Sequence, residues 1–230
     1  MSKLLANQVN YRYSISMLKK LVSRKNSEAR GFLYNVFDVL LNVVIIVAVV
    51  AVIRTFVVSP FEVEGNSMVP TLENNQYIII NKFGYLMGSP GRGDVVVFRP
   101  PTDMHKYYVK RIIGLPGDTI SIRDGEVSIV EDSNYTKLNE DYLDDRNSGR
   151  TFKSPVGTGD KSEELFTVPE DNFFVLGDNR QGSLDSRSFR NAQGESTPYV
   201  HKDNIAGRVW FVALPITKSH ALEIPDYGQE

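Results

Sequence analysis

The chain has 230 residues, of which 41% are hydrophobic, so it can build one sizeable core and is not a disordered protein. Its 26 basic and 28 acidic side chains give a net charge of −2, which provides no electrostatic basis for binding nucleic acid. Cysteine is absent, which excludes disulfides, thiolate metal sites and a cysteine nucleophile, and no H-E-x-x-H motif is present. The sequence therefore predicts no nucleic-acid partner, no metal and no cofactor.

Positive charge is concentrated at the N-terminus. Residues 1–30 contain seven basic side chains and one acidic side chain, a net charge of +6, so the remainder carries −8. Residues 36–58 are predominantly apolar, and as a helix these 23 residues would span roughly 34 Å, against roughly 30 Å for the hydrocarbon core of a bilayer. The sequence predicts a transmembrane anchor at 36–58, preceded by a basic arm at 1–35.

The charges that flank the anchor predict its orientation. Five Lys or Arg residues lie in 16–35, whereas Arg54 is alone in 54–73. The positive-inside rule then predicts a cytoplasmic arm, with everything after the anchor on the far side of the membrane. A cleaved signal peptide is the alternative, but it would start nearer the N-terminus and end in a small-x-small site, whereas RTFVVSPFEVEG follows here.

Short runs of β-forming residues, separated by turns, follow the anchor. They are FEVEG, QYIII, DVVVF, YYVKRII, TISI, EVSIV, NFFVLG and GRVWFVAL. Asp124-Gly125 separates two alternating runs and predicts a hairpin. Because no comparably periodic helical segment intervenes, the sequence predicts a mainly β domain over 59–230, an antiparallel sandwich or barrel.

Residues 131–165 differ in composition from the rest of this domain. Fourteen of these 35 residues are Asp, Glu, Lys or Arg, and large apolar residues are few. We interpret the segment as a solvated insertion or a small subdomain, and not as a second core.

Ser67 lies in the turn-rich stretch EGNSMVPTL, where it either forms a turn or acts as a nucleophile. The three histidines are in no recognisable catalytic signature, so a serine nucleophile would need another base. A lysine can serve if burial lowers its pKa. In YYVKRIIGLPGD, strand alternation puts Lys110 between Tyr108 and Ile112 on one face, which suits this role. Alternatively, Lys110 and Arg111 are edge-strand charges that limit aggregation.

A third stretch, LGDNRQGSLDSR at Leu176 to Arg187, is rich in turn formers, hydroxyls and charges. It is either a surface turn with charge pairs or a loop beside the lysine. In the second case a hydroxyl would accept the hydrogen bond of the lysine, and a carboxylate and a guanidinium would brace the loop.

Together and in this order, GNSMVPTL, GDVVVF, VKRIIGLPGD and LGDNRQGSLDSR resemble the motifs of type I signal peptidases, the Ser-Lys endopeptidases of the bacterial plasma membrane and its organelle descendants. The resemblance runs from about Phe56 to Leu214. It implies a signal-peptidase-like, mostly β fold and removal of signal peptides after a small-x-small site. The expected partners are preproteins that bear signal peptides and the lipid bilayer. The expected location is the bacterial plasma membrane, with an extracytoplasmic catalytic domain.

The resemblance also implies roles for individual residues. Ser67 matches the nucleophile, and its backbone N–H matches one oxyanion donor. Lys110 matches the general base, and Ser183 matches the hydroxyl that orients the lysine. Asp185 and Arg187 match a charged pair with a structural role. The GD at 177–178 and the NR that follow belong to the same motif and are expected to support that loop.

The substrate site is less uniform within the family. One branch has a serine that supplies the second oxyanion donor two residues before the nucleophile, but this chain has Gly65 there, so the second donor must be backbone or water. The signal peptide is expected to add to the sheet as an extended strand, with alternate side chains in shallow apolar pockets. By the same matching, the pocket walls are Phe61, Val63, Met68, Leu72, Tyr108 and Val109.

Two other functions fit parts of the sequence. Self-cleaving repressors of the LexA type are related in fold and in the Ser-Lys device, but they carry a DNA-binding helical domain where this chain has an anchor. The non-enzymatic alternative is a membrane-tethered β module that binds exported chains without cutting them. A cleavage assay distinguishes this module from a peptidase.

Overall fold

The computed structural model describes residues 34–52, 54, 58–152 and 162–227, and the chain divides into two units, Met1–Ile53 and Arg54–Glu230. In the first unit, the helix Tyr34–Val52 is long and apolar enough to cross a membrane. A helix satisfies its own backbone hydrogen bonds, which is what a segment inside a bilayer requires even when it is rich in valine and isoleucine. Residues 1–33 of the predicted basic arm lie outside the described residues.

The helix is described over Tyr34–Val52, and the predicted anchor was 36–58. Residues 53 and 55–57 lie outside the described residues, and Val58, the last residue of the predicted anchor, is the first residue of the first strand of the second unit. The apolar pattern continues across this boundary, so hydropathy alone did not separate helix from strand. Valine suits both a membrane helix and a strand, and therefore does not mark the change.

The second unit contains an antiparallel sheet in the order β1-β2-β11-β3-β4-β9-β10, with β12 paired to β11. The strands are β1 (Val58–Glu62), β2 (Tyr77–Asn81), β3 (Val95–Phe98), β4 (Tyr108–Gly114), β9 (Asn172–Leu176), β10 (Tyr199–His201), β11 (Ile205–Leu214) and β12 (His220–Ala221). Helical turns are short, and they are α2 (Gly84–Met87), η2 (Lys202–Asn204) and η3 (Ile216–Lys218).

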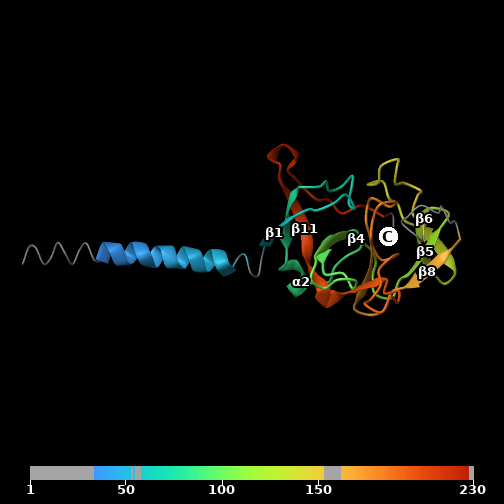
Figure 1. Cartoon of the computed structure of the whole chain (residues 1–230), viewed down its shortest axis with the longest axis horizontal. Coiled ribbons are helices and arrows are strands. Elements are labelled where there is room, and N and C mark those ends of the chain that lie inside the picture. The colour runs from blue at the N-terminus through green and yellow to red at the C-terminus, as the bar shows by residue number, and fades with distance from the viewer. Residues whose placement is uncertain (1–33, 53, 55–57, 153–161, 228–230) are drawn as a thin grey trace, which may run out of the picture. The chain divides into compact units, whose positions relative to one another are not determined.

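A smaller antiparallel sheet has the order β7-β6-β5-β8, and Figure 1 shows β5, β6 and β8 together at the end of this unit away from β1 and β11. Its strands are β5 (Thr119–Arg123), β6 (Glu126–Glu131), β7 (Asn134–Lys137) and β8 (Glu164–Thr167). The predicted hairpin is confirmed, because Arg123 pairs with Glu126 around Asp124 and Gly125. Both turn residues have positive φ, 54° and 87°, as a tight hairpin turn requires. The prediction of a mainly β, antiparallel domain is confirmed.

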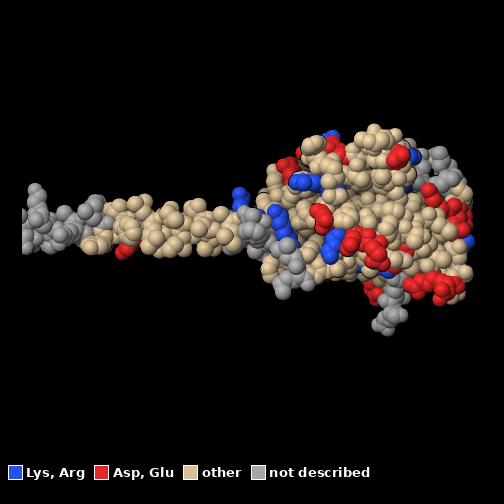
Figure 2. All heavy atoms as spheres, turned by 90° about the horizontal axis from the view of Figure 1, so that it is seen from below, with Lys and Arg blue, Asp and Glu red and all other residues tan. Residues whose placement is uncertain are grey.

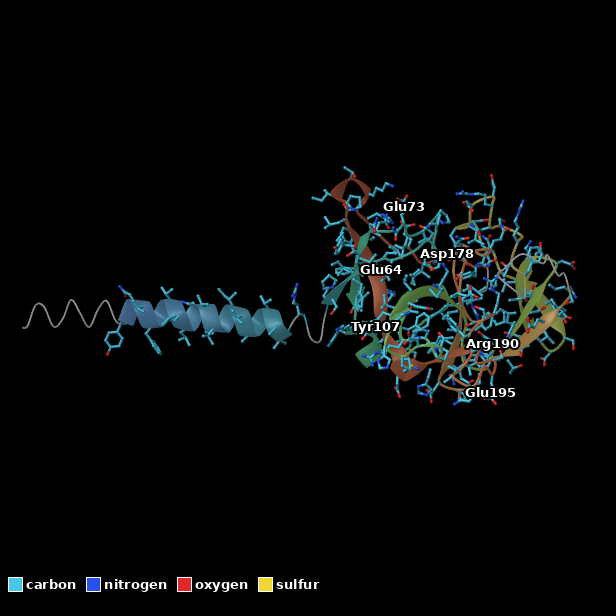
Figure 3. All side chains as sticks on the ribbon, viewed as in Figure 1. Glu64, Glu73, Tyr107, Asp178, Arg190 and Glu195 are labelled. Atoms are coloured by element: carbon cyan, nitrogen blue, oxygen red, sulfur yellow. The ribbon has the colours of Figure 1, made fainter. Side chains whose placement is uncertain are left out.

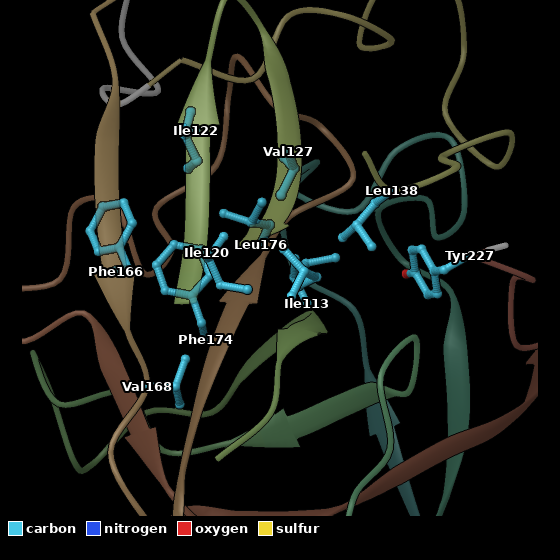
Figure 4. Packing of buried hydrophobic residues seen from close by; sticks show 11 residues of the cluster. Ile113, Ile120, Ile122, Val127, Leu138, Phe166, Val168, Phe174, Leu176 and Tyr227 are labelled. Atoms are coloured by element: carbon cyan, nitrogen blue, oxygen red, sulfur yellow. The ribbon is translucent and has the colours of Figure 1, made fainter. Parts of the chain in front are cut away.

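One hydrophobic cluster joins the two sheets, as Figure 4 shows. Alternate residues of β5 and β6 point inward and meet residues of β4 and β9. The buried members are Ile113, Ile120, Ile122, Val127, Ile129, Leu138, Phe166, Val168, Phe174, Leu176 and Tyr227. This packing fixes the smaller sheet against β4, the strand that carries Lys110.

The segment 131–165 contributes more to the fold than its composition suggested. It supplies β7 and the first residues of β8, and Leu138 and Thr151 are buried. The prediction of a solvated segment does not hold for these residues, because some of its polar groups pair inside the protein. Acidic side chains nevertheless gather on the surface of the second unit (Figure 2), as its negative charge leads one to expect.

Candidate active site

Ser67 follows β1 in a tight turn. Gly65 has φ +92°, a conformation that favours glycine, and its N–H donates to Asn74 Oδ1 at 2.7 Å. The turn continues with the Leu72 N–H bonded to the Met68 carbonyl at 2.9 Å. This arrangement directs the chain away from the strand and leaves Ser67 half-buried.

Lys110 lies against Ser67. Its Nζ donates to Ser67 Oγ at 2.6 Å and to the Val109 carbonyl at 2.8 Å. The side chain of Tyr108 flanks it, with the amine 5.4 Å from the ring centroid. Because β4 lies between β3 and β9 and Lys110 is only 3% exposed, the alternative of an edge-strand charge is wrong.

The environment of Lys110 favours the neutral form of its amine. Burial lowers the pKa of Lys110 from 10.5 to about 8, although the negative charges of Asp185 and Asp178 act in the opposite direction. At pH 7 about a tenth of the amine is therefore neutral, and at pH 8 about half of it is. In that form the Ser67 hydroxyl can donate to Nζ, which is the geometry that general-base catalysis requires.

Ser183 lies next to this pair without bonding to the lysine. Its hydroxyl is buried and makes no hydrogen bond of ordinary geometry within the described part of the chain, so the expected bond to Lys110 is absent there. The backbone at Gly177 lies very close to both Ser183 and Ser67. A Cβ added to Gly177 would lie 2.1 Å from Ser183 Oγ and 2.5 Å from the Ser67 carbonyl oxygen. Only glycine fits between these two groups.

Asp185 and Arg187 form the charged pair that the sequence suggested. Arg187 donates from Nε and NH2 to the two carboxylate oxygens at 2.8 and 2.7 Å, and both side chains are buried. Burial alone would raise the pKa of Asp185, but the adjacent guanidinium outweighs it and holds the pKa below its usual value. Asp185 also accepts from the Gly177 N–H at 3.1 Å, and Arg187 donates to the Phe152 carbonyl. The pair thus braces both ends of the loop.

A second buried pair lies on the opposite face of β4, and the sequence predicted a supporting role for its carboxylate, Asp178, but not its partner. Arg111 donates to both oxygens of Asp178 at 3.0 and 2.7 Å, and its guanidinium lies 4.1 Å from the ring centroid of Tyr142. Thr71, from the turn that contains Ser67, donates to the same carboxylate. The charges were visible in VKR and GDNR, but no local pattern indicated that they would meet.

Arg180 connects this loop to the segment 131–165. It is fully buried and donates to both carboxylate oxygens of Glu140, to Tyr142 and to Thr151. Its partners are 29 to 40 residues away in the chain. The segment that composition marked as an insertion therefore supports the loop at 176–187.

Asn179 links the loop directly to the turn that contains Ser67; the sequence predicted a supporting role in the loop for Asn179 but not its bonding partners. Its backbone N–H donates to the Ser67 carbonyl at 3.1 Å, and its Nδ2 donates to the Asn66 carbonyl at 3.0 Å. The motif indicated that Asn179 supports the loop, but a turn former carries no local signal for which carbonyl groups it will bind.

A cleft of about 590 Å³ opens beside Ser67 and Lys110. Of the predicted pocket residues, Phe61, Val63, Tyr108 and Val109 line it. Other lining residues include Glu64 and Tyr107, which are labelled in Figure 3, and Leu184. The rings of Phe61 and Tyr107 meet edge to face with centroids 5.2 Å apart.

Met68 and Leu72 do not belong to the cleft lining. They are 1% and 0% exposed and pack in the hydrophobic cluster with Val63, Ile78 and Ile80. Their positions after Ser67 in a helical turn direct them inward, which a pattern of apolar residues could not reveal. In this structure they belong to the hydrophobic core that packs next to Ser67 in the chain.

Comparisons with known proteins show what the chain is similar to. A family model described as signal peptidase, peptidase S26, matches residues 36–214. A signal peptidase I of Bacillus licheniformis is 34% identical over 200 residues, covering 87% of this chain and 96% of that protein. Signal peptidase I S of Bacillus subtilis strain 168 is 38% identical over 176 residues, covering 76% and 88%. A crystal structure of a signal peptidase I from Enterococcus faecalis V583 is 31% identical, covers 53% of this chain and 97% of that one, and has a TM-score of 0.39.

Proposed function

Since the chain belongs to the signal peptidase family, peptidase S26, we propose that it removes signal peptides from exported preproteins with a catalytic pair formed by Ser67 and Lys110. The observation that carries the proposal is the 2.6 Å hydrogen bond between Lys110 Nζ and Ser67 Oγ in a buried site. A buried lysine with a lowered pKa is the base that a serine needs when no histidine is adjacent.

In the acylation step, neutral Lys110 takes the proton of the Ser67 hydroxyl as Oγ attacks the scissile carbonyl carbon. The carbonyl oxygen becomes an oxyanion, and the Ser67 N–H is available to stabilise it. When the C–N bond breaks, the lysine ammonium gives its proton to the leaving amine, which becomes the N-terminus of the mature protein. Lys110 then deprotonates a water that hydrolyses the ester on Ser67 and returns the proton to the serine oxygen.

The cleft supports a preference for small side chains before the cut. Phe61 lines it from β1, Val63 lines it from the residue just after β1, and Tyr108 and Val109 line it from β4, so an extended peptide can lie between these two segments. β1 is the last strand of its sheet and has one unpaired edge. We expect that changing the residue before the cut from Ala to Phe stops cleavage, and equal cleavage of both preproteins would contradict this.

The charge pattern and the apolar helix support a topology for the whole chain. The helix Tyr34–Val52 would anchor the protein in the bacterial plasma membrane, with the basic arm in the cytoplasm and residues 59–230 on the outer side as the catalytic domain. Preproteins would then reach the cleft after their signal peptide has entered the bilayer. Protease accessibility of the second unit in inside-out and right-side-out vesicles tests this orientation.

The central experiment compares the full chain, purified in detergent, with Ser67→Ala and Lys110→Met variants on a labelled model preprotein. We expect the parent to cut after a small-x-small site and both variants to be inactive while keeping the circular dichroism of the parent. A parent that binds the preprotein and never cuts it would instead indicate the tethered binding module.

A further inference from the structure

The orientation of one peptide group decides whether the Ser67 N–H can meet an oxyanion. Asn66 and Ser67 share this group, which carries the Asn66 carbonyl and the Ser67 N–H. Among the described residues, the cis peptides are those before Pro70 and Pro215, so this group is trans. In a planar trans peptide the C=O and the N–H point in opposite directions, so that holding one of them aims the other.

Asn179 holds the carbonyl of this group. Its Nδ2 donates to the Asn66 carbonyl at 3.0 Å, and because a carbonyl oxygen only accepts, the nitrogen of the amide must face it. The backbone N–H of the same residue holds the next carbonyl, that of Ser67, at 3.1 Å. The Val69 N–H also reaches the Asn66 carbonyl, at a longer 3.3 Å. The carbonyl is thus drawn toward the loop that follows β9, and the Ser67 N–H points away from that loop.

Because position 65 offers no side-chain donor, the Ser67 N–H must supply a larger share of the hydrogen bonding that stabilises the oxyanion. Glycine has no hydroxyl to offer, and the Gly65 N–H is already bound to Asn74 Oδ1 at 2.7 Å. The Ser67 N–H, by contrast, has no acceptor among the described residues. Its alignment is therefore decisive for stabilising the negative oxygen.

We propose that Asn179 is a positioning residue that aims the Ser67 N–H at the oxyanion through the Asn66–Ser67 peptide group. The proposal rests on the proposed function, because it takes Ser67 as the nucleophile. Asn179 is not among the residues that line the cleft, so it acts on the reaction through this peptide and not by touching the substrate.

The first variant is Asn179→Ala, which removes the amide and keeps the backbone N–H. Loss of a whole oxyanion donor typically costs about 10² to 10³ in kcat, and here the Val69 N–H still holds the carbonyl, so we expect kcat to fall by about 10 to 100-fold. KM and the midpoint of the pH profile should not change. Asn179→Asp keeps the shape but replaces the donor by an acceptor, and we expect at least the same loss.

Gln181→Ala is the matched control. Gln181 lies in the same loop, and its side-chain amide likewise donates to a backbone carbonyl, but that carbonyl belongs to Arg146 and not to the turn that contains Ser67. If Asn179 only anchored the loop, removing either amide would have a similar effect. We expect Gln181→Ala to retain the kcat of the parent.

A substrate pair reports on the oxyanion itself. One peptide carries the normal scissile amide, and the other carries a thioamide, whose larger sulfur is a poorer acceptor for an aligned N–H. We expect Asn179→Ala to slow cleavage of the normal peptide far more than that of the thioamide, so that the ratio of their kcat values falls by about tenfold. An equal fall for both peptides, an effect on KM alone, or the same loss in Gln181→Ala would overturn the positioning role and leave the proposed function intact. A parent that cuts neither peptide would overturn the proposed function and this inference with it.

Discussion

Replacing Lys110 by methionine should stabilise the fold at neutral pH while abolishing activity. The lysine is 3% exposed, and burial lowers its pKa to about 8. A charged amine is favoured in the unfolded chain, where its pKa is near 10.5, so the folded state loses stability as the pH falls from 10.5 toward 8. Methionine has a similar length and no charge, and removes this cost.

The expected size of the effect follows from the two pKa values. The difference between 10.5 and about 8 corresponds to about 3 kcal/mol, and this cost is fully present below about pH 8. At pH 9.5 the unfolded lysine is mostly charged and the folded one is mostly neutral, so about half of the cost remains. The unpaired Val109 carbonyl in the variant offsets the gain by about 1 kcal/mol at every pH. The stability difference between Lys110→Met and the parent should therefore be about 2 kcal/mol larger at pH 7 than at pH 9.5.

Thermal unfolding followed by near-ultraviolet circular dichroism measures this difference, because the single tryptophan, Trp210, and most aromatic residues lie in the second unit. For a domain of this size, about 2 kcal/mol corresponds to a change of about 4 to 8 °C in the separation of the two Tm values. Lys137→Met is the control, since that lysine is 62% exposed at its side chain. A separation between Lys110→Met and the parent that is the same at both pH values would refute the reasoning.

Three further predictions concern the same site. With the neutral amine of Lys110 as the proposed base, kcat/KM should rise about tenfold from pH 6 to pH 7 and level off above about pH 8, and a flat profile for preprotein cleavage would contradict this. Asp185→Asn leaves the Arg187 guanidinium buried without its counter-charge and should cost about 3 to 5 kcal/mol, measured as a lower Tm; an unchanged Tm would show that the pair does not brace the loop. Gly177→Ala places a Cβ 2.1 Å from Ser183 Oγ and should lower kcat at least about 100-fold, whereas Gly91→Ala, whose Cβ would meet its nearest neighbour at 3.7 Å, should retain the activity.

The sequence by itself determined the features that depend on local pattern. An apolar run of sufficient length predicts a membrane helix, alternation with Asp124-Gly125 predicts a hairpin, and short β runs without a periodic helix predict an antiparallel fold. The motifs around Ser67 and Lys110, in their order along the chain, were sufficient to indicate the family. These features can be predicted from sequence because each depends on residues that are close together in the chain and not on which strands pair.

Only the tertiary structure decided which side chains meet. Ser67 and Lys110 are 43 residues apart, and their contact depends on how β1 and β4 are placed in one sheet. The same holds for the bond between Arg180 and Glu140, and for the bond from the Asn179 side-chain amide to the Asn66 carbonyl. Apolar character was likewise insufficient to tell cleft walls from core, because the direction of a side chain after a tight turn follows from backbone angles and packing. Catalytic geometry comes from strand register and buried charge pairing, and both are properties of the folded chain as a whole.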